Sequence, residues 1–138
     1  QTTAGWQAYA PDGQRILLQS HPQDILDLSL PPVSLSLLSS YEKVYLSTDP
    51  GDAGAQAAIR ELSVNNALPS PLATACYEDS VLCADLPLKT CGDATGTAAV
   101  FILRSSHETA VTFTDHCLVV QGEDLLMIAD KLVLEQYG

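Results

Sequence analysis

The sequence predicts an α/β fold: a small layered sandwich in which a mixed sheet of about four to five strands packs against two to three helices, stabilised by disulfide bonds. Three observations predict it. The apolar run from Ala98 to Leu103 is bounded by turn residues, as expected of a central strand covered on both faces. Apolar residues recur at helical spacing from Leu125 to Val133, which indicates an amphipathic helix. Finally, 4 cysteines, all in the second half of the chain, form an even set that is typical of disulfide bonding.

The beginning of the chain carries turn and break signals. Residues 1–13 end in Pro-Asp-Gly and show little periodicity, which predicts an N-terminal arm or edge element. Residues 14–138 are expected to form a single α/β domain, because this length is close to the common domain size. Arg15 to Gln19 predicts a short strand. After the break at His21-Pro22, the acids and leucines from Asp24 to Leu30 fit a single helical turn.

The middle of the chain predicts a helix, a strand and a second helix. Pro31-Pro32 favours a helix with proline in its first turn, although the Val-Ser-Leu-Ser-Leu alternation that follows also fits a strand. Lys43 to Thr48 predicts a strong strand. After a Pro-Gly turn, Asp52 is placed to cap a helix from Ala53 to about Asn65.

The next part of the chain contains most of the cysteines. Leu72 to Tyr77 predicts a strand that carries Cys76. Residues 78–97 then predict a long irregular insert that bears Cys83 and Cys91. Loops of this length in a compact domain usually have a specific role, so the insert is a candidate functional surface.

The end of the chain predicts strands followed by a helix. Val111 to Phe113 and Cys117 to Val120 either pair as a hairpin around Thr114-Asp115-His116 or form one bent strand. Gln121-Gly122-Glu123-Asp124 is expected to open the final helix, because acids in a first turn interact favourably with the helix dipole.

The spacing of the cysteines favours structural disulfides. Successive cysteines are separated by 6, 7 and 25 residues, and metal or redox sites usually need a Cys-x-x-Cys pair. Of the three possible connectivities we favour Cys76 with Cys83 and Cys91 with Cys117, which would attach the start and end of the insert to the sheet. A buried free thiol at Cys117 is the alternative.

Disulfides and the first residue both bear on localisation. Disulfides persist in oxidising compartments. A chain that begins at Gln1 without an initiator Met is typical of a mature protein after signal cleavage or of a fragment excised from a larger one. We therefore expect an extracellular or cell-surface protein.

The charge of the chain excludes some partners. With 17 acidic and 6 basic residues, the formal net charge is −11, which repels nucleic acid and anionic lipid. No apolar run is long enough to span a bilayer, so membrane insertion of the mature chain is not expected. The acidity fits a solvated secreted surface best; cation binding or life at low external pH are alternatives.

Candidate chemistry is sparse. Asp49 follows a strand, at the edge where open α/β sheets bind ligands, so it is a candidate base or metal ligand together with Asp52; turn and helix-cap roles compete with this. His116 and Cys117 are adjacent on a predicted strand and would point to opposite faces, so they cannot act as a catalytic pair. No motif indicates a cofactor or a metal site, which favours a non-enzymatic role.

Two functions remain. The first is a secreted or cell-surface structural or interaction domain, a self-assembling subunit of an extracellular structure, whose partners are copies of itself or a surface assembly. A weakly charged exterior suits such packing because few charges must be desolvated at each contact. The second is a small extracytoplasmic ligand-binding or hydrolytic domain with a pocket near Asp49.

Overall fold

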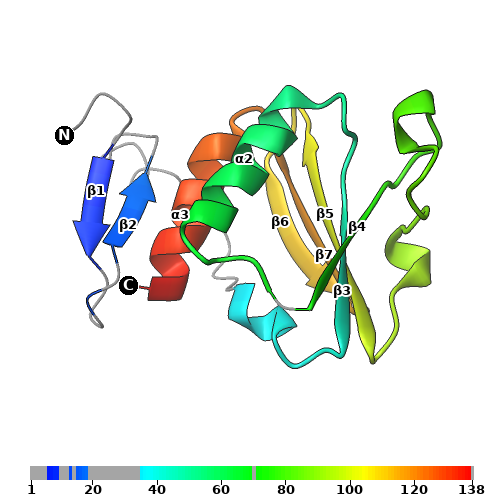
Figure 1. The fold of residues 1–138 in the computed structure, drawn as a ribbon, viewed down its shortest axis with the longest axis horizontal. Coiled ribbons are helices and arrows are strands. Elements are labelled where there is room, and N and C mark those ends of the chain that lie inside the picture. The colour runs from blue at the N-terminus through cyan, green and yellow to red at the C-terminus, as the bar shows by residue number, and fades with distance from the viewer. Residues whose placement is uncertain (1–5, 10–12, 14, 19–34, 70, 138) are drawn as a thin grey trace.

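The computed structural model describes residues 6–9, 13, 15–18, 35–69 and 71–137. Four expected features fall outside these residues: most of the Pro-Asp-Gly turn, the break at His21-Pro22, the helical turn from Asp24 to Leu30 and the opening at Pro31-Pro32. The 14.7 kDa chain forms layers that Figure 1 shows from the side: a hairpin, two helices, a sheet, and the segment that joins two strands of that sheet.

The sheet has five strands in the order β4-β3-β5-β7-β6. The first four run parallel, and β6 pairs antiparallel with β7 at one edge. The mixed five-stranded sheet with helices and two disulfides confirms the predicted fold class. The strands are β3 (Lys43–Ser47), β4 (Leu72–Ala75), β5 (Ala98–Ser105), β6 (Ala110–Thr114) and β7 (Cys117–Gly122).

Two α-helices cover one face of the sheet (Figure 1). Helix α2 (Ala53–Val64) begins where the sequence predicts, because the Asp52 carboxylate accepts a hydrogen bond from the Ala55 amide at 3.1 Å. Helix α3 (Leu125–Tyr137) begins later than expected, since Gln121 and Gly122 still belong to strand β7 and only Glu123 and Asp124 precede the helix. The predicted opening at Gln121 was therefore wrong: strand β7 pairs with β6 through Gln121 and with β5 through Gly122, and this pairing overrides the local turn signal.

Short elements complete the structure. Strand β1 (Trp6–Tyr9), in the expected arm, pairs antiparallel with β2 (Arg15–Leu18), and β2 lies on the outer side of the helices, where Ile16 and Leu18 join their core. Of the helix expected after Pro31-Pro32, the described part is one 3-10 turn, η1 (Leu35–Leu38). Two further 3-10 turns, η2 (Val81–Cys83) and η3 (Cys91–Asp93), lie in the segment between β4 and β5.

Strand β5 separates two hydrophobic clusters. Its alternate residues Ala99, Phe101 and Leu103 pack towards the helices in the main core. Val100 and Ile102 face the other side, where Tyr45, Tyr77 and Val119 pack with them beneath the segment between β4 and β5. Because neighbouring residues of a strand point to opposite faces, burial on both sides explains why this stretch is apolar without interruption.

Strands β6 and β7 form a hairpin, the first of the two expected arrangements. Thr114 pairs with Cys117 across a two-residue turn whose members, Asp115 and His116, have φ of 50° and 67°. Positive φ at both positions is the geometry that tight hairpins require, and Asp tolerates it better than most residues. The Tyr41 hydroxyl lies 2.7 Å from His116 Nδ1 and holds the turn against the loop before β3.

Candidate functional site

The segment between β4 and β5 is attached to the sheet by two disulfides. The structure joins Cys76 to Cys83 and Cys91 to Cys117, and the described residues contain no free cysteine. The first bond closes the turn that contains η2. The second ties η3 to the first residue of β7. Figure 1 shows the whole segment on the side of the sheet opposite α2 and α3.

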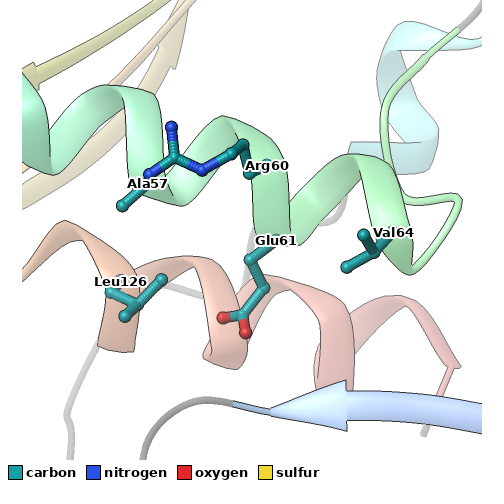
Figure 2. A pocket seen from close by; sticks show the side chains of 5 residues that line it. All are labelled: Ala57, Arg60, Glu61, Val64 and Leu126. Carbon is teal, nitrogen blue, oxygen red and sulfur yellow. The ribbon is translucent and has the colours of Figure 1, made fainter. Parts of the chain in front are cut away.

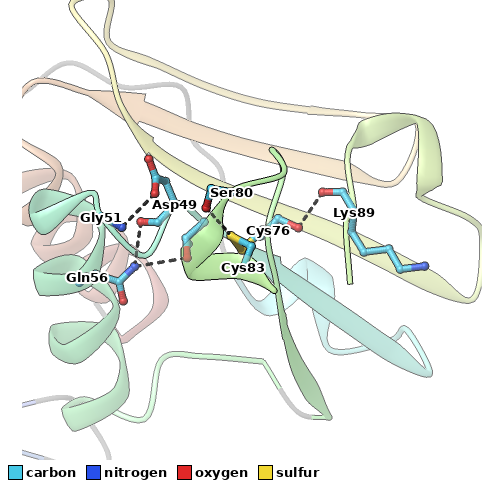
Figure 3. Close-up of a disulfide and its surroundings, with 9 residues drawn as sticks. Asp49, Gly51, Gln56, Cys76, Ser80, Cys83 and Lys89 are labelled. Atoms are coloured by element: carbon cyan, nitrogen blue, oxygen red, sulfur yellow. Dashed lines mark hydrogen bonds between the residues drawn. A yellow bond between two sulfur atoms is a disulfide. The ribbon is translucent and has the colours of Figure 1, made fainter. Parts of the chain in front are cut away.

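Hydrogen bonds to the backbone also hold this segment in place (Figure 3). Cys76 accepts from the Lys89 amide at 2.8 Å, and its own amide donates to Pro87 O at 3.0 Å. The Ser47 hydroxyl, at the end of β3, donates to Lys89 O at 2.7 Å. Hydrogen bonds of this kind, together with the disulfides, give a long loop one conformation, which is what a packing or recognition surface needs.

The turn at η3 has its own local support. Asp93 accepts from the Thr90 amide at 2.9 Å while Thr90 and Asp93 form a capping box. The hydrogen bond from the Thr90 backbone is the main cause that lowers the pKa of Asp93, aided by the Thr90 hydroxyl and by Lys89. The carboxylate is therefore structural at this turn rather than a free ligand for a cation.

Large apolar side chains are exposed on this segment. Val81 is 94% exposed and Leu82 64%, although both belong to the disulfide-bonded turn η2, and Leu88 is also exposed. Acidic side chains flank them in the sequence: Glu78 and Asp79 before, Asp85 after, all exposed. Apolar side chains fixed outwards in solvent are a feature of interaction surfaces. We call Val81 and Leu82 the apolar knob.

Asp52 lies at the carboxyl edge of the sheet, where it bridges two elements. Besides capping α2, it accepts from the Ser105 amide at 2.7 Å and the Ser105 hydroxyl at 2.6 Å. Burial raises the pKa of the Asp52 carboxyl, but the hydrogen bonds from Ser105 and from the amides of Ala55 and Gly54 outweigh burial and hold the pKa below its usual value. Both oxygens of the carboxylate thus accept hydrogen bonds from the fold.

Asp49 does not share these contacts. Its exposed side chain accepts from the Gly51 amide at 2.9 Å, and its carbonyl accepts from the Gln56 side chain at 3.2 Å (Figure 3). The negative charge of Asp49 also affects Tyr77. Burial is the main cause that raises the pKa of the Tyr77 phenol, and the carboxylates of Asp49, Asp52 and Glu78 raise it further. Asp49 and Asp52 therefore lie at the same edge, but they face different partners.

Asp49 lines neither of two cavities found on the described part of the surface. One, of about 460 Å³, is open and is lined by Ser105, Ser106, His107 and Glu123 at the carboxyl edge of the sheet. His107 Nδ1 lies 2.9 Å from Glu123 Oε1, and both side chains are exposed. The Ser105 hydroxyl donates to Asp52 rather than to His107. In the described part of the chain, no hydrogen bond joins a serine to His107 at this edge.

The other cavity lies between the two helices (Figure 2). It has a volume of about 250 Å³ and is lined by Ala57, Arg60, Glu61, Val64 and Leu126. The first four side chains come from α2, and Leu126 comes from α3. We call it the interhelix cavity. Sequence reasoning did not find it, because the cavity depends on how two helices pack against each other.

Among the residues that the structure describes, no three His, Cys, Asp or Glu side chains come together in a way that could hold a metal ion. No helix in that part of the chain is both long and apolar enough to cross a bilayer.

Comparison with known protein families, with curated proteins and with solved structures finds no match to this chain.

Proposed function

We propose that this chain is a secreted or cell-surface structural domain that assembles with copies of itself or with a surface structure, and that it has no catalytic activity. The observation that carries the proposal is Val81, an apolar side chain 94% exposed at the tip of a disulfide-bonded turn. A cross-linked turn that presents apolar side chains to water loses little conformational entropy when a partner covers it, and this favours binding.

Three further features support the proposal. Two disulfides fit an oxidising, extracellular environment. The apolar knob belongs to a segment on the face of the sheet away from the main core, so its exposure is not needed to build the fold. Only 17% of residues are charged, which limits the desolvation cost of packing many copies together.

The test is the size of the protein in solution. Light scattering across a range of concentrations, on the full chain and on a chain without its first ten residues, is expected to show assembly that grows with concentration. A full chain that stays monomeric at every concentration contradicts the self-assembly part of the proposal. Loss of assembly in the shortened chain alone assigns the contact to the N-terminal residues.

A second candidate, a small ligand-binding or hydrolytic domain, is favoured by one observation. The cavity lined by Ser105, Ser106, His107 and Glu123 lies beyond the carboxyl ends of β5 and β7, where ligands of α/β proteins bind. Its size lies within the usual range for small-molecule pockets, roughly 300–1,000 Å³. Turnover of a nitrophenyl ester that is abolished by His107→Ala would support this candidate; equal background rates for both proteins would exclude ester hydrolysis at this site.

A further inference from the structure

The apolar knob and the interhelix cavity are complementary features on opposite sides of the sheet. The knob belongs to the segment that covers one face, whereas the cavity lies between the helices that cover the other face (Figures 1 and 2). The Leu82 side chain lies close to Gly51, in the turn after β3. A Cβ atom added to Gly51 would be in van der Waals contact with Leu82 Cδ1, at 3.5 Å. Val81, next to it, projects into solvent. The knob is therefore supported on its inner side and free on its outer side.

The size and lining of the cavity suit aliphatic side chains. A volume of about 250 Å³ is below the range of small-molecule pockets, roughly 300–1,000 Å³, but is enough for one or two branched side chains. Ala57, Val64 and Leu126 give it apolar walls. The Val64 side chain is 62% exposed, and an apolar side chain inserted into the cavity would cover it. Covering the exposed side chains of the knob and of Val64 would favour the contact, because it removes apolar surface from water.

Charge complementarity favours a second copy as the partner. Arg60, an exposed member of a set of only 6 basic residues, lines the cavity. The knob is flanked by the exposed acids Glu78 and Asp79. Glu61 also lines the cavity, but its side chain is buried, so the charge exposed to a partner is that of Arg60. Arg60 at the cavity would therefore attract the acidic residues that surround the apolar knob.

We propose that the apolar knob of one copy inserts into the interhelix cavity of the next copy. The inference rests on the proposed self-assembly and names the two surfaces that make it. Because knob and cavity lie on opposite sides of the sheet, each contact leaves a free cavity on one copy and a free knob on the other. Such a heterologous contact repeats, and it generates a ring if the rotation closes and a filament if it does not.

The experiment uses two variants of the full oxidised chain that each destroy one surface. The double variant Val81→Ser with Leu82→Ser removes the knob at exposed positions, so the fold should be unaffected. The variant Ala57→Glu fills the cavity with a negative charge and places Glu three residues before Arg60, a spacing that helices favour. Phe113→Ser, on strand β6, is the control for the loss of an exposed apolar side chain elsewhere.

Sedimentation across a range of concentrations is the readout. The wild-type protein and Phe113→Ser are expected to form species larger than a dimer, and each surface variant alone is expected to remain monomeric. An equimolar mixture of the two surface variants is expected to form a dimer and nothing larger, because the only intact knob can enter the only intact cavity. Circular dichroism and intact mass verify that every variant is folded and oxidised.

The outcomes separate this inference from the proposed function. If the wild type assembles and the mixture yields no dimer, the knob–cavity contact is wrong while self-assembly stands. If Phe113→Ser alone abolishes assembly, the contact runs along the free edge of β6 and the inference is wrong. If the wild type is monomeric at all concentrations, self-assembly itself fails and the inference fails with it.

A charge exchange tests the acidic rim separately. Arg60→Glu is expected to raise the concentration needed for assembly by about tenfold, since it replaces attraction at the rim with repulsion. Mixing this variant with Asp79→Lys should restore assembly beyond the dimer, because the two variants then meet with opposite charges at both of their contacts. Wild-type assembly in Arg60→Glu would exclude a contribution from the rim charges.

Discussion

Asp52 and Ser105 are joined by two hydrogen bonds, one from the Ser105 amide at 2.7 Å and one from its hydroxyl at 2.6 Å. The two residues are 53 positions apart in the sequence. Asp52 precedes α2 and Ser105 ends β5, so this single carboxylate ties the first turn of a helix to the end of the central strand.

Replacing Asp52 with Ala is expected to destabilise the fold by about 2–3 kcal/mol. Loss of a helix cap costs about 1 kcal/mol, and the Ser105 amide and hydroxyl lose their acceptor as well. Urea unfolding measures the loss. Asp49→Ala is the matched control at the same edge; because the Asp49 side chain is exposed and accepts a hydrogen bond only from Gly51 in its own turn, a change below about 0.5 kcal/mol is expected. Equal losses in both variants would contradict the bridging role of Asp52.

The same carboxylate should make stability depend on pH under acidic conditions. The folded pKa of Asp52 lies below its ordinary value of 3.8, so the folded state binds this proton less tightly than the unfolded state does. The resulting stabilisation is fully present above pH 3.8 and is lost as the pH falls through the folded pKa. The difference in unfolding free energy between wild type and Asp52→Asn should therefore shrink below pH 3.8. A constant difference from pH 6 to pH 2 would show that the pKa is not lowered.

The two disulfides should contribute unequally. Cys91 and Cys117 are 26 residues apart and Cys76 and Cys83 only 7. In the chain-entropy model, removing them costs about 3.5 and about 2.4 kcal/mol respectively. Urea unfolding of the two double Cys→Ser variants measures this order. A larger loss for the Cys76–Cys83 variant would show that local packing at η2 outweighs loop entropy.

The two phenylalanines of the chain provide a matched test of the core. Phe101 is fully buried on β5, whereas Phe113 on β6 is 38% exposed. Phe101→Ala is expected to cost about 3–5 kcal/mol through lost burial and the cavity it leaves. Phe113→Ala should cost less than half of that. Thermal or urea unfolding of the two variants checks the ratio, and similar losses would contradict the position of β5 at the centre of the fold.

Local patterns explain which elements were predictable. β5 and α3 carry their own signals, an unbroken apolar run and a helical repeat, so neither depends on distant residues for its recognition. The helix boundary at Gln121 was misplaced because pairing with β6 through Gln121 and with β5 through Gly122, which the local sequence does not reveal, extends β7. The hairpin stayed ambiguous because Asp115-His116 lacks the Asn-Gly signature of its turn type.

The candidate surfaces also differ in whether the local sequence could reveal them. The exposed Val81-Leu82 pair could have been noticed as two apolar residues between acidic ones, since only local sequence is involved. The link from Asp52 to Ser105 and the interhelix cavity depend on long-range packing of α2 against β5 and α3. Asp49 was a candidate because it follows a strand, but the nearby Asp52 is the acid that forms hydrogen bonds with the end of β5.

The position of β5 between two separate clusters has an evolutionary consequence. Helix-facing residues such as Phe101 and Leu118 belong to a core that the segment from Cys76 to Thr97 does not enter. Substitutions at exposed positions of that segment leave this core untouched, provided that the four cysteines remain. Relatives of this chain are therefore expected to diverge fastest between residues 78 and 90 while keeping the helix-facing half of the sheet, so that binding preference can change without a change of fold.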